Sequence, residues 1–335
     1  MTVQLRSWWQ RAKKSLAVVG IIVAVALAVV VIVAIIGGYL FHWGWIGLGP
    51  YTSSPNYQRG KTFWDWLQLF ATLGIPIVVV YASARLNHDL QIARNQQEAS
   101  RQATQDQQRQ ETLQTYLSKM SELLQNKDLN DPAKAGVEIR ALARAWTLMA
   151  SRVLDANRKG ILLQFLSESG LINIDKTAVD LRWADLSGVV LNKAILSETN
   201  LFNVDLSGAI LNDVDFEKAN LCFANLSGAN LRGAHFDKAY LPSVILSGAN
   251  LEKAYFGEIY LNGAILRRAN LRGTDLRGTD LSGADLSGAN LSGADLSGAN
   301  LKGAKYNTKA ISTKEPTQWP QGFDPKAAGA ICVDR

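Results

Sequence analysis

Residues 281–300 read LSGADLSGANLSGADLSGAN, with a leucine at every fifth position and an alanine two residues before each following leucine. In an α-helix each residue turns by about 100°, so leucines five apart would spread around the whole helix. In a flat β-strand an odd spacing would place successive leucines on opposite faces. Neither element can bury this pattern, so the backbone has to bend at every repeat.

The five-residue period extends far beyond this stretch. All 26 positions in steps of five from Leu181 to Tyr306 are Leu, Phe or Tyr. All 25 positions in steps of five from Ala184 to Ala304 are Ala, Val, Thr or Ile. A large and a small apolar side chain in every repeat predict one shared interior, with the other three positions facing water.

The units ADLSG, ANLRG and ANLSG resemble the A(D/N)LxG unit of pentapeptide-repeat proteins. The resemblance implies a right-handed quadrilateral β-helix, a solenoid with four repeats per coil, in which residues twenty apart stack. Phe216, Phe236 and Phe256 are spaced by twenty and are expected to form one aromatic column in the repeat core. A solenoid of this kind needs a cap at each end.

Two apolar segments precede the repeat. Leu16–Phe41 is a run of 26 uncharged residues, longer than the roughly 20 that span a bilayer. Trp66–Ala84 is a second uncharged run, of 19 residues, which is expected to span as well or to form an interfacial or re-entrant helix. The basic residues between positions 6 and 14 favour a cytoplasmic N-terminus. We therefore predict a two-helix transmembrane hairpin, with both termini cytoplasmic, in a plasma or thylakoid membrane.

The rest of the chain divides by composition. A polar, Gln-rich segment predicts a helical stalk, and two amphipathic segments after it predict a helical unit that caps the first coil. The stretches RGKTFWDWLQL, RKGILLQFLSESGLI and QWPQGFDPKAAGAI are similar to membrane-anchored pentapeptide-repeat proteins frequent in cyanobacteria. The predicted domains are the hairpin 1–84, the stalk 85–126, the helical N-cap unit 127–172, the β-helix 173–306 and a C-terminal capping tail 307–335.

Charge and reactive residues give little basis for catalysis. The net charge is +6, but residues 181–304 hold 11 Lys or Arg and 13 Asp or Glu, a net of −2. Phosphate binding needs a clustered positive face, so no nucleic-acid partner is expected. The three histidines and two cysteines have no metal or disulfide spacing. We expect no enzymatic activity, no cofactor, no metal and no small-molecule substrate.

A candidate protein-binding surface lies at the outward position before each core residue. This position is usually Asp or Asn, but in the middle of the repeat it becomes large and apolar, and twenty-residue stacking pairs these side chains in columns. Their exposure would indicate an interface with a protein partner or a second copy, unless the helical unit or the tail covers them. The candidates are Val190, Ile210, Tyr240, Ile245, Tyr260 and Ile265.

The sequence thus favours a non-enzymatic, membrane-anchored scaffold or complex subunit that presents the β-helix in the cytoplasm for protein–protein interaction. One alternative is a regulator that mimics DNA toward a topoisomerase-like target, as gyrase-binding pentapeptide proteins do. That function needs a strongly acidic rod, and the clustered Arg267, Arg268, Arg272 and Arg277 argue against it. A second alternative is an oligomeric accessory to membrane transport.

Overall fold

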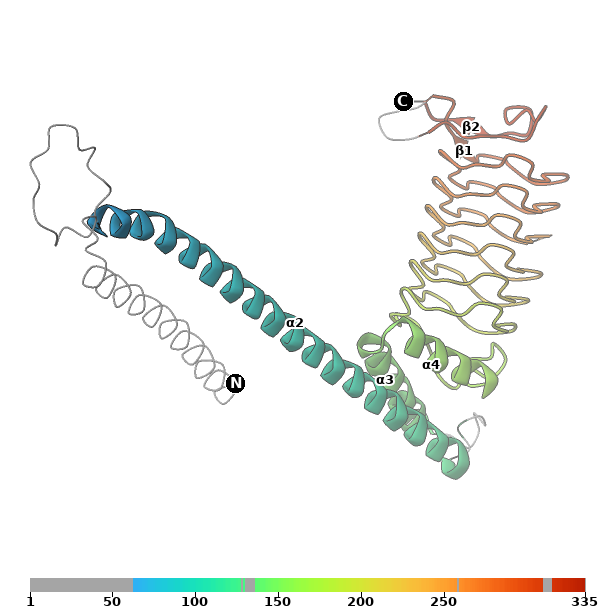
Figure 1. Ribbon diagram of the computed structural model, residues 1–335. Coiled ribbons are helices and arrows are strands. Elements are labelled where there is room, and N and C mark those ends of the chain that lie inside the picture. Colours follow the sequence, from blue (N-terminus) through green and yellow to red (C-terminus); the bar gives the residue numbers. More distant parts are fainter. Residues whose placement is uncertain (1–62, 128, 130–135, 258, 310–314, 335) are drawn as a thin grey trace, which may run out of the picture. The chain divides into compact units, whose positions relative to one another are not determined.

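The computed structural model describes residues 63–127, 129, 136–257, 259–309 and 315–334 (Figure 1). The chain forms two compact units, residues 1–100 and 101–335. Its helices are α2 (Phe63–Lys127), α3 (Val137–Val153) and α4 (Ala156–Glu168), and its short strands are β1 (Lys305–Tyr306) and β2 (Ile331–Cys332).

Helix α2 is a single helix of 65 residues that contains Pro76. The predicted second span, 66–84, and the predicted stalk, 85–126, are therefore parts of one element. No helix within the described ranges is both long and apolar enough to cross a membrane, so the predicted hairpin receives no support from the structure. The predicted first span, Leu16–Phe41, lies outside the described residues.

The second unit contains a solenoid whose coils repeat every twenty residues, which confirms the fold expected from the five-residue period. Parallel bridges join residues twenty apart, from the pair Asp185–Asp205 to the pair Asp285–Lys305. Backbone amides donate in both directions along the stack. Leu186 N donates to Asp205 O at 2.9 Å, and Asp205 N donates to Ala184 O at 3.1 Å. Figure 1 shows the coils stacked one on the next.

A tight turn at every fifth residue bends each coil. In the first turn, Ala184 N donates to Leu181 O at 2.8 Å, and Trp183 between them has a φ of 69°. Positive φ at the third residue of a β-turn is the feature that defines type II and that favours glycine. The equivalent position is Gly188 in the next turn, with a φ of 68°. This turn is the bend that the sequence period requires.

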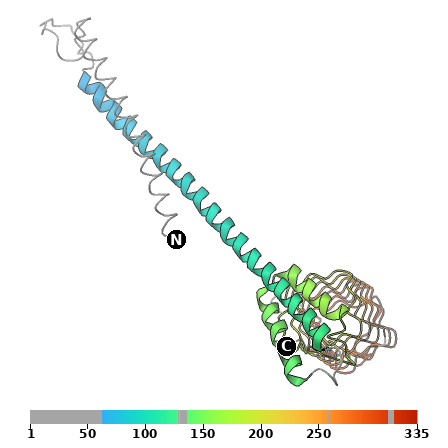
Figure 2. The ribbon, with the colours of Figure 1, turned by 90° about the horizontal axis from the view of Figure 1, so that it is seen from below.

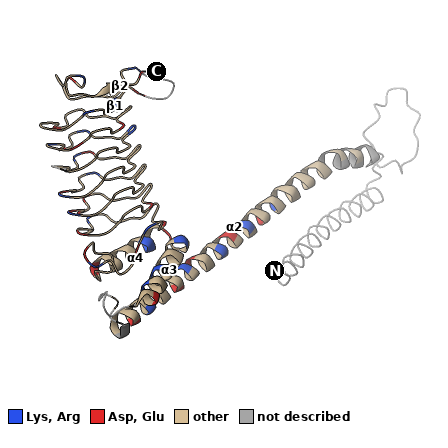
Figure 3. Cartoon of the chain, turned by 180° about the vertical axis from the view of Figure 1, so that it is seen from behind, with Lys and Arg blue, Asp and Glu red and all other residues tan. Residues whose placement is uncertain are grey.

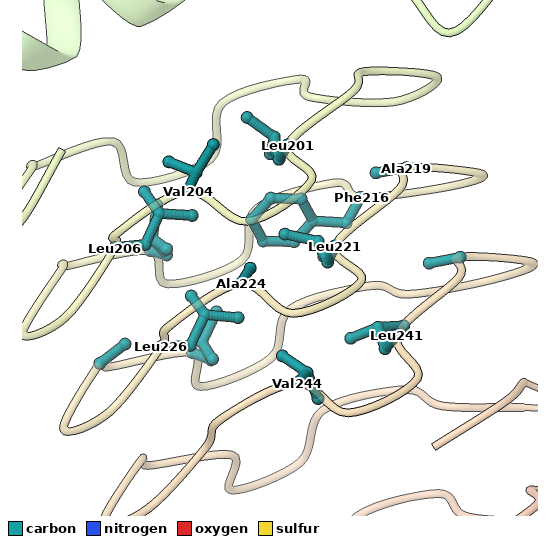
Figure 4. Packing of buried hydrophobic residues seen from close by; sticks show 14 of the residues in the cluster. Leu201, Val204, Leu206, Phe216, Ala219, Leu221, Ala224, Leu226, Leu241 and Val244 are labelled. Atoms are coloured by element: carbon teal, nitrogen blue, oxygen red, sulfur yellow. The ribbon is translucent and has the colours of Figure 1, made fainter. Parts of the chain in front are cut away.

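The interior is filled by the two apolar positions of each repeat (Figure 4). Phe216, Phe236 and Phe256 are fully buried and form a stacked column, with ring centroids 5.2 and 4.5 Å apart. Thr274 and Thr279 take the small position, and their hydroxyls donate to the carbonyls of Leu251 and Phe256. Buried hydroxyls are tolerated here because each has a hydrogen-bond acceptor.

Helices α3 and α4 close the first coil, and Figures 1 and 2 show these green helices across this end of the solenoid. Gly160 of α4 lies so close that a Cβ there would be 2.6 Å from the carbonyl oxygen of Val190. Buried Lys159 Nζ lies 2.9 Å from Asp185 Oδ1 of the first coil. The end of α2 packs on α3, where the hydroxyls of Tyr116 and Thr147 are 2.9 Å apart.

The C-terminal segment closes the last coil. Gln318 forms a parallel bridge with Asn290, and β2 pairs in parallel with β1. Trp319 packs edge-on against Tyr306 at 5.5 Å and stacks on Phe323 at 5.3 Å. The aromatic side chains of the segment thus lie over the final core residue of the solenoid.

Candidate protein-binding surface

Outward side chains form four columns along the solenoid, because bridged residues are twenty apart. Two neighbouring columns matter for the site, and we name them by their large members. The tyrosine column is Asn200, Asn220, Tyr240, Tyr260, Asp280 and Asn300. The isoleucine column is Asp185, Asp205, Asn225, Ile245, Ile265, Asp285 and Lys305.

The Asp and Asn members of the columns stabilise the turns that follow them by accepting hydrogen bonds from backbone amides. Asp205 Oδ1 accepts a hydrogen bond from Ser207 N, and Asp295 Oδ1 accepts one from Ser297 N, each at 3.0 Å. A hydrogen bond from Arg277 lowers the pKa of Asp275. A general acid needs the opposite shift, so Asp275 has the environment of a turn former rather than of a catalytic acid.

The two tyrosines of the tyrosine column lie on successive coils and are exposed. Their ring centroids are 6.5 Å apart, and the side chains of Tyr240 and Tyr260 are 51% and 58% exposed. Ile245 and Ile265 occupy the same two coils in the isoleucine column and are partly exposed. The structure therefore brings these four predicted residues together.

Val190 and Ile210 do not join them. They pair with each other in a third column, on the first two coils of the solenoid. Val190 also lies under α4, where its backbone amide donates to Ala156 O at 3.3 Å. The six predicted residues therefore do not make one surface, because part of the set lies beside the N-terminal cap.

The turns between the tyrosine and isoleucine columns carry large apolar residues that the sequence analysis missed. Trp183, Phe202, Phe223 and Pro242 occupy these turns on four successive coils, and we call them the aromatic corner. Phe202 and Phe223 pack edge-on with centroids 5.7 Å apart. Trp183 is 73% exposed and Phe223 is 51% exposed. Together with Tyr240, Tyr260, Ile245 and Ile265, the aromatic corner forms what we call the aromatic surface.

Two members of the aromatic corner have a strained backbone. Trp183 has a φ of 69° and Phe223 a φ of 57°, in the left-handed region that bulky residues rarely occupy. Most turns in the C-terminal coils have glycine at this position, including Gly283 and Gly303 of the same corner. Other turn residues such as Lys193 and Glu198 have the same conformation, so what distinguishes this corner is the aromatic side chain, and this signal could have been read from the sequence as aromatic residues at glycine positions.

Most of the aromatic surface is free of formal charge. No Asp, Glu, Lys or Arg occurs in residues 199–204, 219–231, 239–251 or 259–266, which carry all its members except Trp183, whose turn contains Arg182 and is followed by Asp185. The opposite corner differs, with charged residues on nearly every coil, namely Lys193, Asp213, Arg232, Glu252, Lys253 and Arg272. Elsewhere on the solenoid, charges of both signs are scattered rather than gathered by sign (Figure 3).

Reactive and metal-binding groups are sparse around this surface. Cys222 lies beside Phe223 but is buried, and burial raises the pKa of its thiol, which disfavours the nucleophilic thiolate. Within the described part of the chain, no group of three His, Cys, Asp or Glu residues could hold a metal ion. What the aromatic surface offers is apolar contact area.

A family model for pentapeptide repeats, described as "Pentapeptide repeats (8 copies)", matches overlapping segments that together cover residues 179–303. The chain is a pentapeptide-repeat protein. The matched repeats include every member of the aromatic surface. No curated protein matches the sequence of the chain.

Several solved pentapeptide-repeat structures are similar to this one. QnrB1, a plasmid-mediated fluoroquinolone resistance protein, is 18% identical over 43% of this chain and 89% of its own, with a TM-score of 0.31. HetL of the cyanobacterium Nostoc sp. strain PCC 7120, involved in heterocyst differentiation regulation, is 24% identical over 43% and 72%, with a TM-score of 0.21. Another pentapeptide repeat protein of Nostoc PCC 7120 is 30% identical over 43% and 84%, with a TM-score of 0.16. Each similarity covers less than half of this chain.

Proposed function

We propose that this pentapeptide-repeat protein is a non-enzymatic scaffold that binds a protein through the aromatic surface. The observation that carries the proposal is the exposure of Trp183, Phe223, Tyr240 and Tyr260 around one corner of the solenoid, whose middle, residues 219–231 and 239–251, carries no formal charge. Contiguous apolar patches of several hundred Å² on a soluble domain usually mark interaction sites. Tyr and Trp are also the residues most enriched at binding hot spots.

We propose further that the scaffold is tethered to a membrane by residues 16–41. This part of the proposal rests on the sequence alone: 26 residues without a charge, preceded by Arg6, Arg11, Lys13 and Lys14. Basic residues flank the cytoplasmic end of membrane spans. The N-terminus would then be cytoplasmic, in a plasma or thylakoid membrane.

Affinity capture from native membranes tests both parts. The tagged chain should sediment with membranes and resist extraction at high pH, and a stable partner should be recovered with it. The double variant Tyr260→Ser, Ile265→Ser removes two large outward side chains and should lose that partner. Ile195→Ser is the matched control, because Ile195 is 71% exposed in a different column.

Thermal unfolding of the variants separates lost binding from lost folding. Tyr260, Ile265 and the control Ile195 all occupy outward positions of the solenoid, so the unfolding temperature should change little. Equal recovery of the partner by the wild type and by the double variant would overturn the proposed binding surface. Release of the chain into the soluble fraction would overturn the tether.

A further inference from the structure

The aromatic surface also indicates what binds to it. We propose that its occupant is a second copy of this chain, so that two solenoids associate side by side about a two-fold axis. This inference rests on the proposed function, since it names the protein that the scaffold binds. The area, the charge and the position of the surface all support it.

The exposed aromatic area matches the centre of a dimer interface. An aromatic side chain buries roughly 150–250 Å². At the exposures of Trp183, Phe223, Tyr240 and Tyr260, the four together offer on the order of 450 Å². A stable interface buries about 800 Å² per partner, of which the apolar centre is only a part. The uncharged Asn and Ser residues around the aromatic surface can supply the remaining rim.

The charge distribution suits self-association in particular. A two-fold interface brings the same patch of both copies together, so any formal charge near its centre meets a like charge. The coil segments that form the aromatic surface contain no charged residue between 219 and 231 or between 239 and 251. The opposite corner carries both signs, with Asp213 and Glu252 beside Arg232, Lys253 and Arg272, so a two-fold interface there would have to bury formal charges.

The centre of the surface fixes which residues meet. The surface runs from Trp183 on the first coil to Ile265 on the fifth, so the turn at Phe223 lies at its middle and the turn at Ser243 is the next one. In a two-fold interface the middle of the patch lies at the axis, where each residue contacts its own copy. Ser243 of one copy should therefore lie close to Ser243 of the other.

Site-specific crosslinking of the purified full-length chain in detergent tests this geometry. In a background of Cys222→Ala and Cys332→Ser, Ser243→Cys places a thiol one coil from the proposed axis. Lys253→Cys is the matched control, because it is half a coil away on the opposite corner. Both positions have nearly the same turn conformation, with φ of 58° for Ser243 and 60° for Lys253. A short bismaleimide should link Ser243→Cys into a dimer and leave Lys253→Cys monomeric.

A second variant keeps the test independent of folding. Trp183→Gly with Phe223→Gly removes two aromatic side chains and relaxes two left-handed residues, so the fold should be no less stable by thermal unfolding. The Ser243→Cys crosslink should nevertheless drop at least tenfold. A crosslink that persists in this double variant, or that forms equally at Lys253→Cys, would overturn the proposal.

The two proposals can fail separately. Suppose that Ser243→Cys gives no dimer, but that the wild type captures a different protein from membranes and the Tyr260→Ser, Ile265→Ser variant does not. The proposed dimer is then wrong, and the aromatic surface remains a binding site for that other protein. If no crosslink forms and capture is unchanged in that variant, both proposals are wrong.

Discussion

At the scale of the residue, the turn position with positive φ decides how well each coil closes. Glycine has no steric penalty there, whereas the left-handed conformation raises the free energy of a residue that has a Cβ. The C-terminal coils use glycine almost throughout, and the N-terminal coils use residues such as Lys193, Glu198 and Lys238. The strain is therefore concentrated in the coils that carry the aromatic corner, where Trp183 and Phe223 combine it with large exposed side chains.

Two alanine substitutions measure this strain. Gly228 has a φ of 66° and open space around an added Cβ, so Gly228→Ala should cost about 1 kcal/mol of unfolding free energy through conformation alone. At Gly233 the added Cβ would be 2.4 Å from Asp213 Oδ1, so Gly233→Ala should cost more, because the carboxylate must also move. Urea denaturation compares the two variants. A Gly228→Ala protein as stable as the wild type would contradict the role of the left-handed turn.

At the scale of the element, the five-residue period predicts the solenoid because each repeat contains the same turn and the same pair of interior positions. The period also predicts the columns, and Phe216, Phe236 and Phe256 lie stacked as residues twenty apart should. The period says nothing about what covers the ends. For that reason it predicts Val190 as part of a binding surface, although α4 lies against this residue.

The aromatic column gives a prediction at this scale. Phe236 is enclosed by Phe216 and Phe256, so Phe236→Ala would leave a cavity and should cost about 3–5 kcal/mol. Phe236→Leu is the matched control, because leucine fills the same position in most repeats. It should cost less than half as much by urea denaturation. Equal losses for the two variants would contradict the claim that the cavity volume sets the cost at this position.

The candidate site is predictable from the sequence only in part. An apolar residue at an outward position identifies Tyr240, Ile245, Tyr260 and Ile265, which the structure places on two adjacent columns. Trp183, Phe202 and Phe223 escape such a prediction because turn positions normally face water and are read as connections. Phe202 and Phe223 are in contact because their turns stack on successive coils. That stacking follows from the twenty-residue coil, not from the five-residue repeat alone.

At the scale of the whole molecule, closure of both ends decides where a partner can bind. Helix α4 lies against the first coil, and residues 315–334 pair with two of the four sides of the last coil, at Asn290 and at Lys305. The sides of the solenoid remain, and the middle of the aromatic surface carries no formal charge. A tether at residues 16–41 would concentrate such solenoids at a membrane and favour their association.

Oxidative footprinting of the protein in its native membrane tests the central claim most directly. Hydroxyl radicals should modify Trp183, Phe223, Tyr240 and Tyr260 several-fold more slowly in native membranes than in a dilute monomeric preparation, because the bound protein excludes water from them. Met149 of α3, which is 67% exposed and lies outside the aromatic surface, should be oxidised at the same rate in both. Equal oxidation of the four aromatic residues in the two preparations would contradict the account.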